Sequence, residues 1–155
     1  MAPWQTTDFP HGAGTVIAEF SVRADGPIWR AQVPATADGI PTAAPYLCLA
    51  VRDGHLTLTA RSLSPDPADP NAQSHVSLDI EDAFGLDPGT IHEAALTFGA
   101  FGTRIYLDGY QCFACAGNLN PSRVHPSGAF DLGSPNAIAC NAFLVDPVDW
   151  DAVRI

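Results

Sequence analysis

The stretch TRIYLDGYQCFACAG (residues 103–117) predicts a β-hairpin. Asp108-Gly109 stands between two apolar runs, and this dipeptide is favoured in two-residue hairpin turns because both turn positions need a positive φ. Such a turn places Leu107 opposite Tyr110 and Ile105 opposite Cys112. Because successive strand residues point to opposite faces, we expect a core face of Ile105, Leu107, Tyr110 and Cys112 and an outward face of Arg104, Tyr106, Gln111 and Phe113.

A second hairpin of the same design is predicted for YLCLAVRDGHLTLTARS (residues 46–62) around Asp53-Gly54. The same pairing rule gives coherent faces here as well. The expected core face contains Leu47, Leu49, Val51, Leu56, Leu58 and Ala60. The expected outward face contains Tyr46, Cys48, Ala50, Arg52, His55, Thr57, Thr59 and Arg61.

The rest of the chain reads as further short strands. Fourteen prolines and thirteen glycines divide the 155 residues, and no helical period extends beyond about two turns. Strands are predicted over residues 15–23, 27–33, 46–52, 55–62, 75–81, 91–99, 103–107, 110–117, 136–145 and 150–155. This pattern favours an all-β fold, a two-sheet antiparallel jelly-roll sandwich, with residues 1–155 as one domain.

The charge balance excludes some classes of partner. Seven arginines and no lysine stand against 17 acidic residues, for a net charge of −10. Neither nucleic acid nor an anionic membrane is expected to bind such a surface. The first residues lack the basic and apolar regions of a signal peptide. A cytoplasmic location is therefore one expectation, and an extracellular one applies if the chain is a module of a longer protein.

Cys112-Phe113-Ala114-Cys115 has the spacing of a redox pair or of half a zinc site. On a strand, however, residues three apart point to opposite faces, with Cα atoms about 10 Å apart, which is too far for a disulfide. A redox pair needs a helix N-terminus and a zinc half-site needs a tight turn. We therefore predict that Cys112 and Cys115 are not bonded to each other and that Cys112 is a small core residue.

The segment DPGTIHEAALTFGAFGTRIYLDGYQCFA (residues 87–114) resembles the central signature of laminin-G-like, concanavalin A-like lectin domains. The matching residues are His92, Leu96, Thr97, Tyr106, Asp108 and Gly109. Ile91 replaces the Trp that precedes the His in that family. The most similar variety is the lectin-like domain beside bacterial sialidases and related glycosidases. The resemblance implies a jelly-roll fold and a sugar-binding module that is an accessory to a catalytic glycosidase domain.

Six residues are candidates for a carbohydrate site. Sugars are held by aromatic rings that stack on their C–H faces and by polar groups that bind their hydroxyls. The candidates are Arg104, Tyr106, Gln111 and Phe113 on the first hairpin and Tyr46 beside Arg61 on the second. An arginine would also suit the carboxylate of an acidic sugar. Ordinary cross-strand packing is the competing interpretation of these pairs.

Other functions stay open as alternatives. Phe113, Tyr106 and the FGAF segment (residues 98–101) would equally suit an interface with a second copy or with a catalytic partner. Catalysis by this chain is not predicted, because the carboxylates of LDIED, Asp79 and Glu81, are followed on their face by Ala83. No cofactor and no metal-binding residue is predicted, although a calcium ion at Asp66, Asp69 and Asn71 stays an alternative.

Overall fold

The computed structural model describes residues 4–5, 13–33, 37–38, 46–63, 74–79, 86–121, 124, 129–133 and 138–145. Its strands are β1 (Trp4–Gln5), β2 (Gly14–Val22), β3 (Gly26–Gln32), β4 (Tyr46–Arg52), β5 (His55–Leu63), β6 (Ser74–Asp79), β7 (Ile91–Gly99), β8 (Gly102–Leu107), β9 (Tyr110–Cys115), β10 (Ala129–Leu132) and β11 (Ile138–Val145). None of the described segments is a helix that could cross a membrane.

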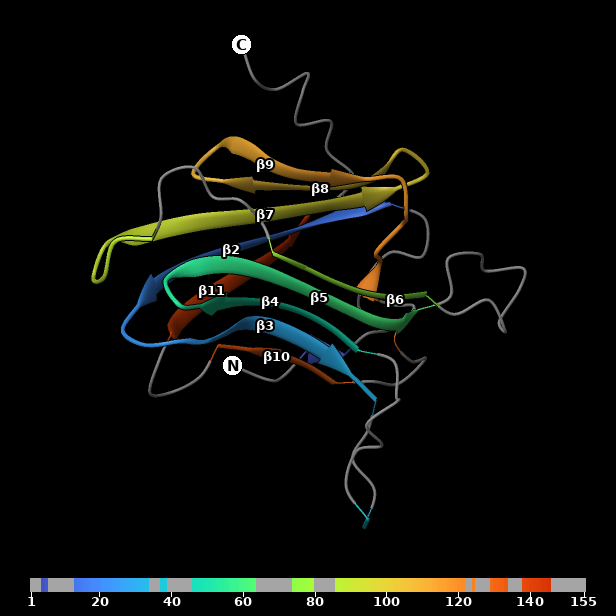
Figure 1. Ribbon diagram of the computed structural model, residues 1–155, viewed down its shortest axis with the longest axis horizontal. Coiled ribbons are helices and arrows are strands. Elements are labelled where there is room, and N and C mark those ends of the chain that lie inside the picture. The colour runs from blue at the N-terminus through green and yellow to red at the C-terminus, as the bar shows by residue number, and fades with distance from the viewer. Residues whose placement is uncertain are drawn as a thin grey trace.

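These strands form two sheets that lie one over the other (Figure 1). Sheet A has six strands in the order β1-β10-β3-β4-β5-β6, and sheet B has five in the order β11-β2-β7-β8-β9. All neighbouring strands run antiparallel, as the register of each pair shows. The predicted fold class, a two-sheet antiparallel sandwich, is therefore confirmed.

The core lies between the two sheets and is made of alternate residues from their inner faces. Sheet B contributes Val16, Phe20, Leu96 and Phe98, and sheet A contributes Leu47, Leu49, Leu56, Leu58 and others, all essentially inaccessible. A bulge in β3 lets both Ile28 and Trp29 point inward. The Trp29 ring stacks on Phe130 of β10 with centroids 5.3 Å apart.

The β4–β5 hairpin has the predicted register. Leu47 pairs with Ala60, Leu49 with Leu58 and Val51 with Leu56. Asp53 and Gly54 have φ angles of 52° and 76°, the conformation of a two-residue turn that matches strand twist. The outward set from Tyr46 to Arg61 consequently shares one face of sheet A, and this face is exposed to solvent at several positions.

The β8–β9 hairpin agrees with the prediction only at its tip. Leu107 pairs with Tyr110 and Tyr106 with Gln111, but a bulge follows and Ile105 pairs with Phe113 instead of Cys112. Two orientations were therefore wrong. Tyr110, expected in the core, is 68% exposed, and Phe113, expected outside, packs against the core cluster.

Tyr106 is a further correction. The prediction placed its ring on an exposed outer face, but only 2% of the residue is accessible. Its strand neighbour across β7 is Ala95, which is also buried. The outer face of sheet B is thus covered at this point. The alternation of residues along β8 could not predict this, because alternation shows which residues share a face but not whether that face is exposed to solvent.

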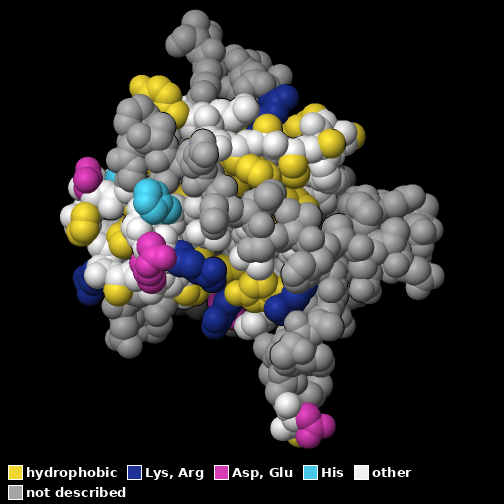
Figure 2. All heavy atoms as spheres, in the orientation of Figure 1, with side chains coloured by type: hydrophobic (Ala, Val, Ile, Leu, Met, Phe, Trp, Pro, Cys, Tyr) yellow, Lys and Arg dark blue, Asp and Glu magenta, His cyan; other side chains and the backbone are white. Residues whose placement is uncertain are grey.

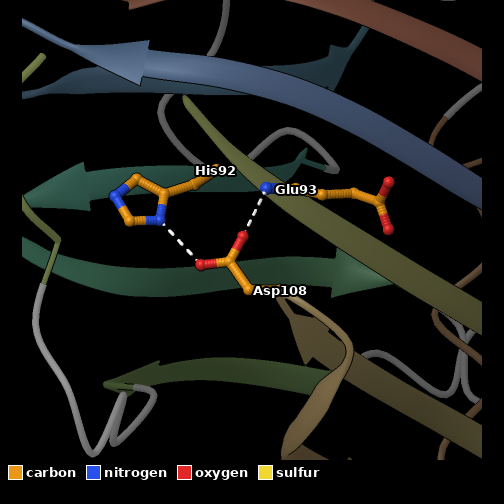
Figure 3. A network of polar contacts seen from close by, with 3 residues as sticks. All are labelled: His92, Glu93 and Asp108. Atoms are coloured by element: carbon orange, nitrogen blue, oxygen red, sulfur yellow. Dashed lines mark hydrogen bonds and ion pairs between the residues drawn. The ribbon is translucent and has the colours of Figure 1, made fainter. Parts of the chain in front are cut away.

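Asp108 ties the tip of this hairpin to the start of β7 (Figure 3). Its carboxylate lies 2.7 Å from Nδ1 of His92 and accepts a 2.8 Å hydrogen bond from the backbone N–H of Glu93. The Asp108 N–H in turn donates to the Glu93 carbonyl oxygen. His92 is buried beside Phe20, with ring centroids 5.8 Å apart. Asp108 therefore serves as a structural clamp as well as a turn residue.

Nine of the ten predicted strands coincide with β2 to β9 and β11, with ends shifted by a few residues. β1 and β10 were missed. β10 lies within the stretch of residues 117–136, which was read as a loop because of its Pro, Ser and Asn content. The predicted strand over residues 150–155 lies outside the described residues.

Candidate functional site

A cleft of about 540 Å³ lies on the outer face of sheet A, across β3, β4 and β5. Its floor consists of four small side chains from the β4–β5 hairpin, namely Cys48, Ala50, Thr57 and Thr59. Its rim consists of four long side chains, namely Arg30, Tyr46, Arg52 and Arg61. The hollow exists because long residues surround a patch of short ones on an otherwise continuous sheet.

The strand register explains why these residues meet. Tyr46 pairs with Arg61 at one end of the hairpin and Arg52 pairs with His55 at the other. Between them Cys48 pairs with Thr59 and Ala50 with Thr57, so the floor occupies the middle of the face. Arg30 reaches the cleft from β3, where it pairs with Cys48.

Tyr46 and Arg61 form one wall of the cleft. The guanidinium carbon of Arg61 lies 5.1 Å from the centre of the Tyr46 ring, within range of a cation–π interaction. Burial raises the pKa of the Tyr46 hydroxyl, and its hydrogen bond to the Cys48 thiol adds to this. The phenol therefore stays protonated and can act as a hydrogen-bond donor at any physiological pH.

Arg30 occupies the β3 side of the cleft. Its Nε lies 3.6 Å from Oδ2 of Asp131 on β10, an ion-pair separation that is too long for a hydrogen bond. Asp131 instead accepts a 3.2 Å hydrogen bond from the Gln32 amide. Within the described part of the chain, the buried Nε of Arg30 has no hydrogen-bond acceptor. The Arg30 side chain as a whole is 42% exposed, so parts of it other than the buried Nε are open to a ligand.

The described residues that line the cleft carry a net positive charge, although the protein as a whole is negatively charged. Three arginines and one aspartate, Asp25, line the cleft, although the whole chain carries a net charge of −10. Figure 2 shows dark blue side chains gathered around a hydrophobic patch over this part of sheet A. Burial raises the pKa of the Cys48 thiol, and the hydrogen bond with Tyr46 and then the charges of Arg30 and Arg52 oppose that shift only in part. Both guanidinium groups are therefore close enough to Cys48, on the floor of the cleft, to affect it electrostatically.

The structure divides the six predicted site residues between the two sheets. Tyr46 and Arg61 lie together in the cleft. The other four are on sheet B and do not form one surface: Arg104 lies over the Phe101 ring at 5.6 Å, Gln111 is exposed, Tyr106 is buried and Phe113 packs against the core.

Arg30 and Arg52, which also line the cleft, were not among the predicted residues. The prediction did place Arg52 on the outward face of the β4–β5 hairpin. On that face, four small residues stand between long side chains, a sign of a hollow that could have identified Arg52: Cys48, Ala50, Thr57 and Thr59. Arg30 could not be found in this way, because the pairing of β3 with β4 includes a bulge after Pro27.

No metal site is present in the described residues, which contain no group of three His, Cys, Asp or Glu side chains placed to hold an ion. The calcium alternative at Asp66, Asp69 and Asn71 lies outside the described residues, as does Glu81. Cys48, Cys112 and Cys115 carry free thiols. Cys112 and Cys115 both lie within β9, so the C-x-x-C spacing stands in a strand rather than at a helix N-terminus.

Solved structures with the same architecture come from several lectin-like proteins. The CBM40 of the Ruminococcus gnavus IT-sialidase, solved bound to α2,3-sialyllactose, matches with a TM-score of 0.64 and 10% identity over 91% of this chain and 80% of that one. Sheep galectin-11, solved with glycerol, matches with a TM-score of 0.53 and 9% identity over 92% and 98%. A leech intramolecular trans-sialidase matches with a TM-score of 0.62 and 11% identity over 92% of this chain and 23% of that one.

In sequence, by contrast, no family model and no curated protein matches the chain. Identities near 10% carry information on the fold and leave the ligand of this chain to be argued from its own residues. The chain therefore has the concanavalin A-like lectin fold, a β-sandwich with a cleft on the outer face of its six-stranded sheet.

Proposed function

We propose that this protein is a non-catalytic carbohydrate-binding module and that the cleft on sheet A is its sugar site. The observation that carries this proposal is the arrangement of long side chains around a floor of small ones, which leaves room for a flat ligand against the sheet. Protein sites for small molecules are concave and combine apolar surface with a few placed polar groups. The cleft has both.

The rim and floor supply the interactions that sugars require. The Arg61 guanidinium lies over one face of the half-buried Tyr46 ring, and the part of the ring that stays exposed offers a contact surface for the C–H face of a pyranose. The guanidinium groups of Arg30 and Arg61 can donate paired hydrogen bonds to neighbouring hydroxyls or to a carboxylate. Thr57 and Thr59 line the same space from the floor, and Thr59 is the more accessible of the two.

The role of accessory to a glycoside hydrolase such as a sialidase is part of this proposal. Its support is the likeness of fold to the CBM40 of a sialidase and to part of a leech trans-sialidase. In this role the module would hold a carbohydrate near a catalytic glycosidase domain, and cleavage would be done by that partner.

Ligand-observed NMR against a panel of neutral and acidic sugars tests the proposal. A shallow cleft with one stacking contact and a few hydrogen bonds suggests a dissociation constant of order 0.1 to 1 mM. Tyr46→Ala should weaken binding about tenfold because the stacking surface is lost. Tyr110→Ala is the matched control, since Tyr110 is an exposed tyrosine on sheet B. Equal effects of the two substitutions would contradict the assignment of the cleft.

Assembly through β9 is the second candidate function. β9 is the last strand of sheet B among those described, and its sequence YQCFAC contains no charge and no proline. Edge strands without such residues tend to pair with another strand. A homo-oligomer formed by this edge would elute early in size-exclusion chromatography, and Ala114→Pro should return it to the monomer position. A monomer at all concentrations would exclude this function.

A further inference from the structure

We propose that the ligand of the cleft is an acidic oligosaccharide that carries several carboxylates and lies along the β4 and β5 strands, as a short polyuronate chain would. This inference rests on the proposed function and adds to it the class and orientation of the ligand. It separates a chain with repeated acidic groups from a single acidic sugar at the end of a glycan.

The spacing of the arginines is the first argument. Arg61 pairs with Tyr46 at one end of the hairpin, and Arg52 pairs with His55 at the other. Tyr46 and Arg52 are six positions apart along β4, which corresponds to about 20 Å at the usual rise per strand residue. One monosaccharide cannot contact both ends, whereas an oligosaccharide laid along the strands can.

Arg30 supplies a cation between these two ends. It pairs across the strands with Cys48, the floor residue nearest Tyr46. Its Nε lies 3.6 Å from the Asp131 carboxylate, while 42% of its side chain is exposed. The cleft thus presents three guanidinium groups in succession, from Arg61 through Arg30 to Arg52.

The floor fits a chain that runs along the strands. Cys48, Ala50, Thr57 and Thr59 form a continuous strip of small residues beneath the arginines, and all four carry no charge. Thr59 is partly exposed, so its hydroxyl is within reach of the ring hydroxyls of a sugar. The strip is interrupted by no long side chain between Tyr46 and Arg52, because the intervening outward positions on β4 are Cys48 and Ala50.

The negative charge of the whole protein restricts where an acidic ligand can bind. At a net charge of −10, the chain repels a polyanion in general. Asp25 lines the Arg52 end of the cleft and accepts a hydrogen bond from the Asp53 N–H, and Asp131 accompanies Arg30. Among the described residues, three cations against these two acids leave the cleft positive, so a polyanion is held only where its carboxylates meet the arginines.

Isothermal titration calorimetry with oligouronates tests the inference. The probes are monogalacturonate, trigalacturonate and hexagalacturonate, the corresponding mannuronates, and the fully methyl-esterified hexagalacturonate as a neutral chain of equal length. We expect the affinity of at least one series to rise by tenfold or more from monomer to hexamer, and methyl esterification to remove most of that gain.

Charge-removing variants locate the contacts. Arg52→Gln and Arg61→Gln should each weaken hexamer binding about tenfold, whereas at most one of them should affect the monomer. Arg104→Gln, on sheet B, is the matched control and should leave the affinity unchanged. Circular dichroism of each variant verifies that the fold is kept.

The outcomes separate this inference from the proposed function. Equal affinity for monomer and hexamer, or no effect of Arg52→Gln on the hexamer, would overturn the extended acidic ligand. Neutral sugars that bind with dependence on Tyr46 and without preference for uronates would do the same while leaving the carbohydrate-binding function intact. Absence of binding to every sugar tested would overturn both.

Discussion

Asp108 combines two roles in a single residue, and this makes its contribution to stability measurable. It adopts a φ of 50°, which few residues with a side chain tolerate, and its carboxylate also binds His92 and the Glu93 N–H. Asp53 has nearly the same φ, 52°, at the tip of the other hairpin. In the described part of the chain, the Asp53 side chain takes part in no hydrogen bond or ion pair. The two turns therefore form a natural pair for comparison.

The first prediction uses that pair. Asp108→Ala should lower the free energy of unfolding by about 1 to 3 kcal/mol more than Asp53→Ala does, because only Asp108 loses side-chain hydrogen bonds and leaves His92 without its partner. Both substitutions carry the same backbone strain, which cancels in the comparison. Urea unfolding of the two variants measures the difference. Equal losses would show that the clamp adds nothing to stability.

The second prediction concerns alkaline pH. Burial raises the pKa of both Cys48 and Tyr46, so the folded protein holds these protons more tightly than the unfolded chain does. Stability from this source is complete below the ordinary pKa of each group, about 8.5 for Cys and 10 for Tyr, and is lost as the pH rises above it. Urea unfolding at increasing pH should show this decline, and Cys48→Ala with Tyr46→Phe should reduce it. A decline unchanged by both substitutions would contradict this origin.

At the scale of the elements, the hairpin glycines distinguish backbone strain from steric overlap. A Cβ at Gly54 or Gly109 would meet nothing within 4 Å, although both have a positive φ. A Cβ at Gly102 would overlap the carbonyl oxygen of Cys115, and the φ of Gly102 is 100°. The first two positions need glycine for conformation alone, whereas Gly102 also needs it for the close approach of β8 to the end of β9.

The third prediction follows from this contrast. Gly54→Ala and Gly109→Ala should each lower the free energy of unfolding by about 1 kcal/mol, because alanine is strained in the left-handed conformation. Gly102→Ala should cost several times more, because the β9 backbone must move as well. Thermal or urea unfolding of the three variants ranks them. A Gly102→Ala variant as stable as Gly109→Ala would show that β9 shifts freely.

The two hairpins also show how far alternation along a strand predicts structure. In β4–β5, apolar and polar residues alternate clearly, so the turn and the pattern agree and the register could be predicted completely. In β9, the sequence YQCFAC places apolar side chains on both faces, so nothing in the pattern reveals the bulge that moves Phe113 opposite Ile105. Turn chemistry fixes the first pairs of a hairpin, and packing decides the rest.

At the scale of the whole molecule, the cleft depends on the β4–β5 floor staying small. The fourth prediction is that Ala50→Phe, which fills the middle of the floor, lowers sugar affinity by tenfold or more. Because Ala50 points away from the core, stability should change by no more than about 0.5 kcal/mol. Ala114→Phe, at an exposed position of β9, is the control. Calorimetric titration and urea unfolding together measure both effects.

Four of the six predicted site residues lie on sheet B, away from the cleft on sheet A, and the reason is physical. The sequence indicates which residues share a face, but the choice between two outward faces depends on which one is covered, and this is decided by segments far away in the chain. Tyr46 and Arg61 were correctly paired because their hairpin is regular. Arg30 joins them through the pairing of β3 with β4, a contact between strands that a long connection separates.

The most direct test of the central claim is an amide chemical-shift titration with an oligosaccharide found to bind. The cleft on sheet A predicts that the largest shifts occur at Cys48, Ala50, Thr57 and Thr59 and at the rim residues Tyr46 and Arg61. The β8–β9 hairpin should stay unchanged. Shifts concentrated at Arg104, Gln111 and Phe113, with the floor of the cleft unaffected, would contradict the account and place the sugar on sheet B.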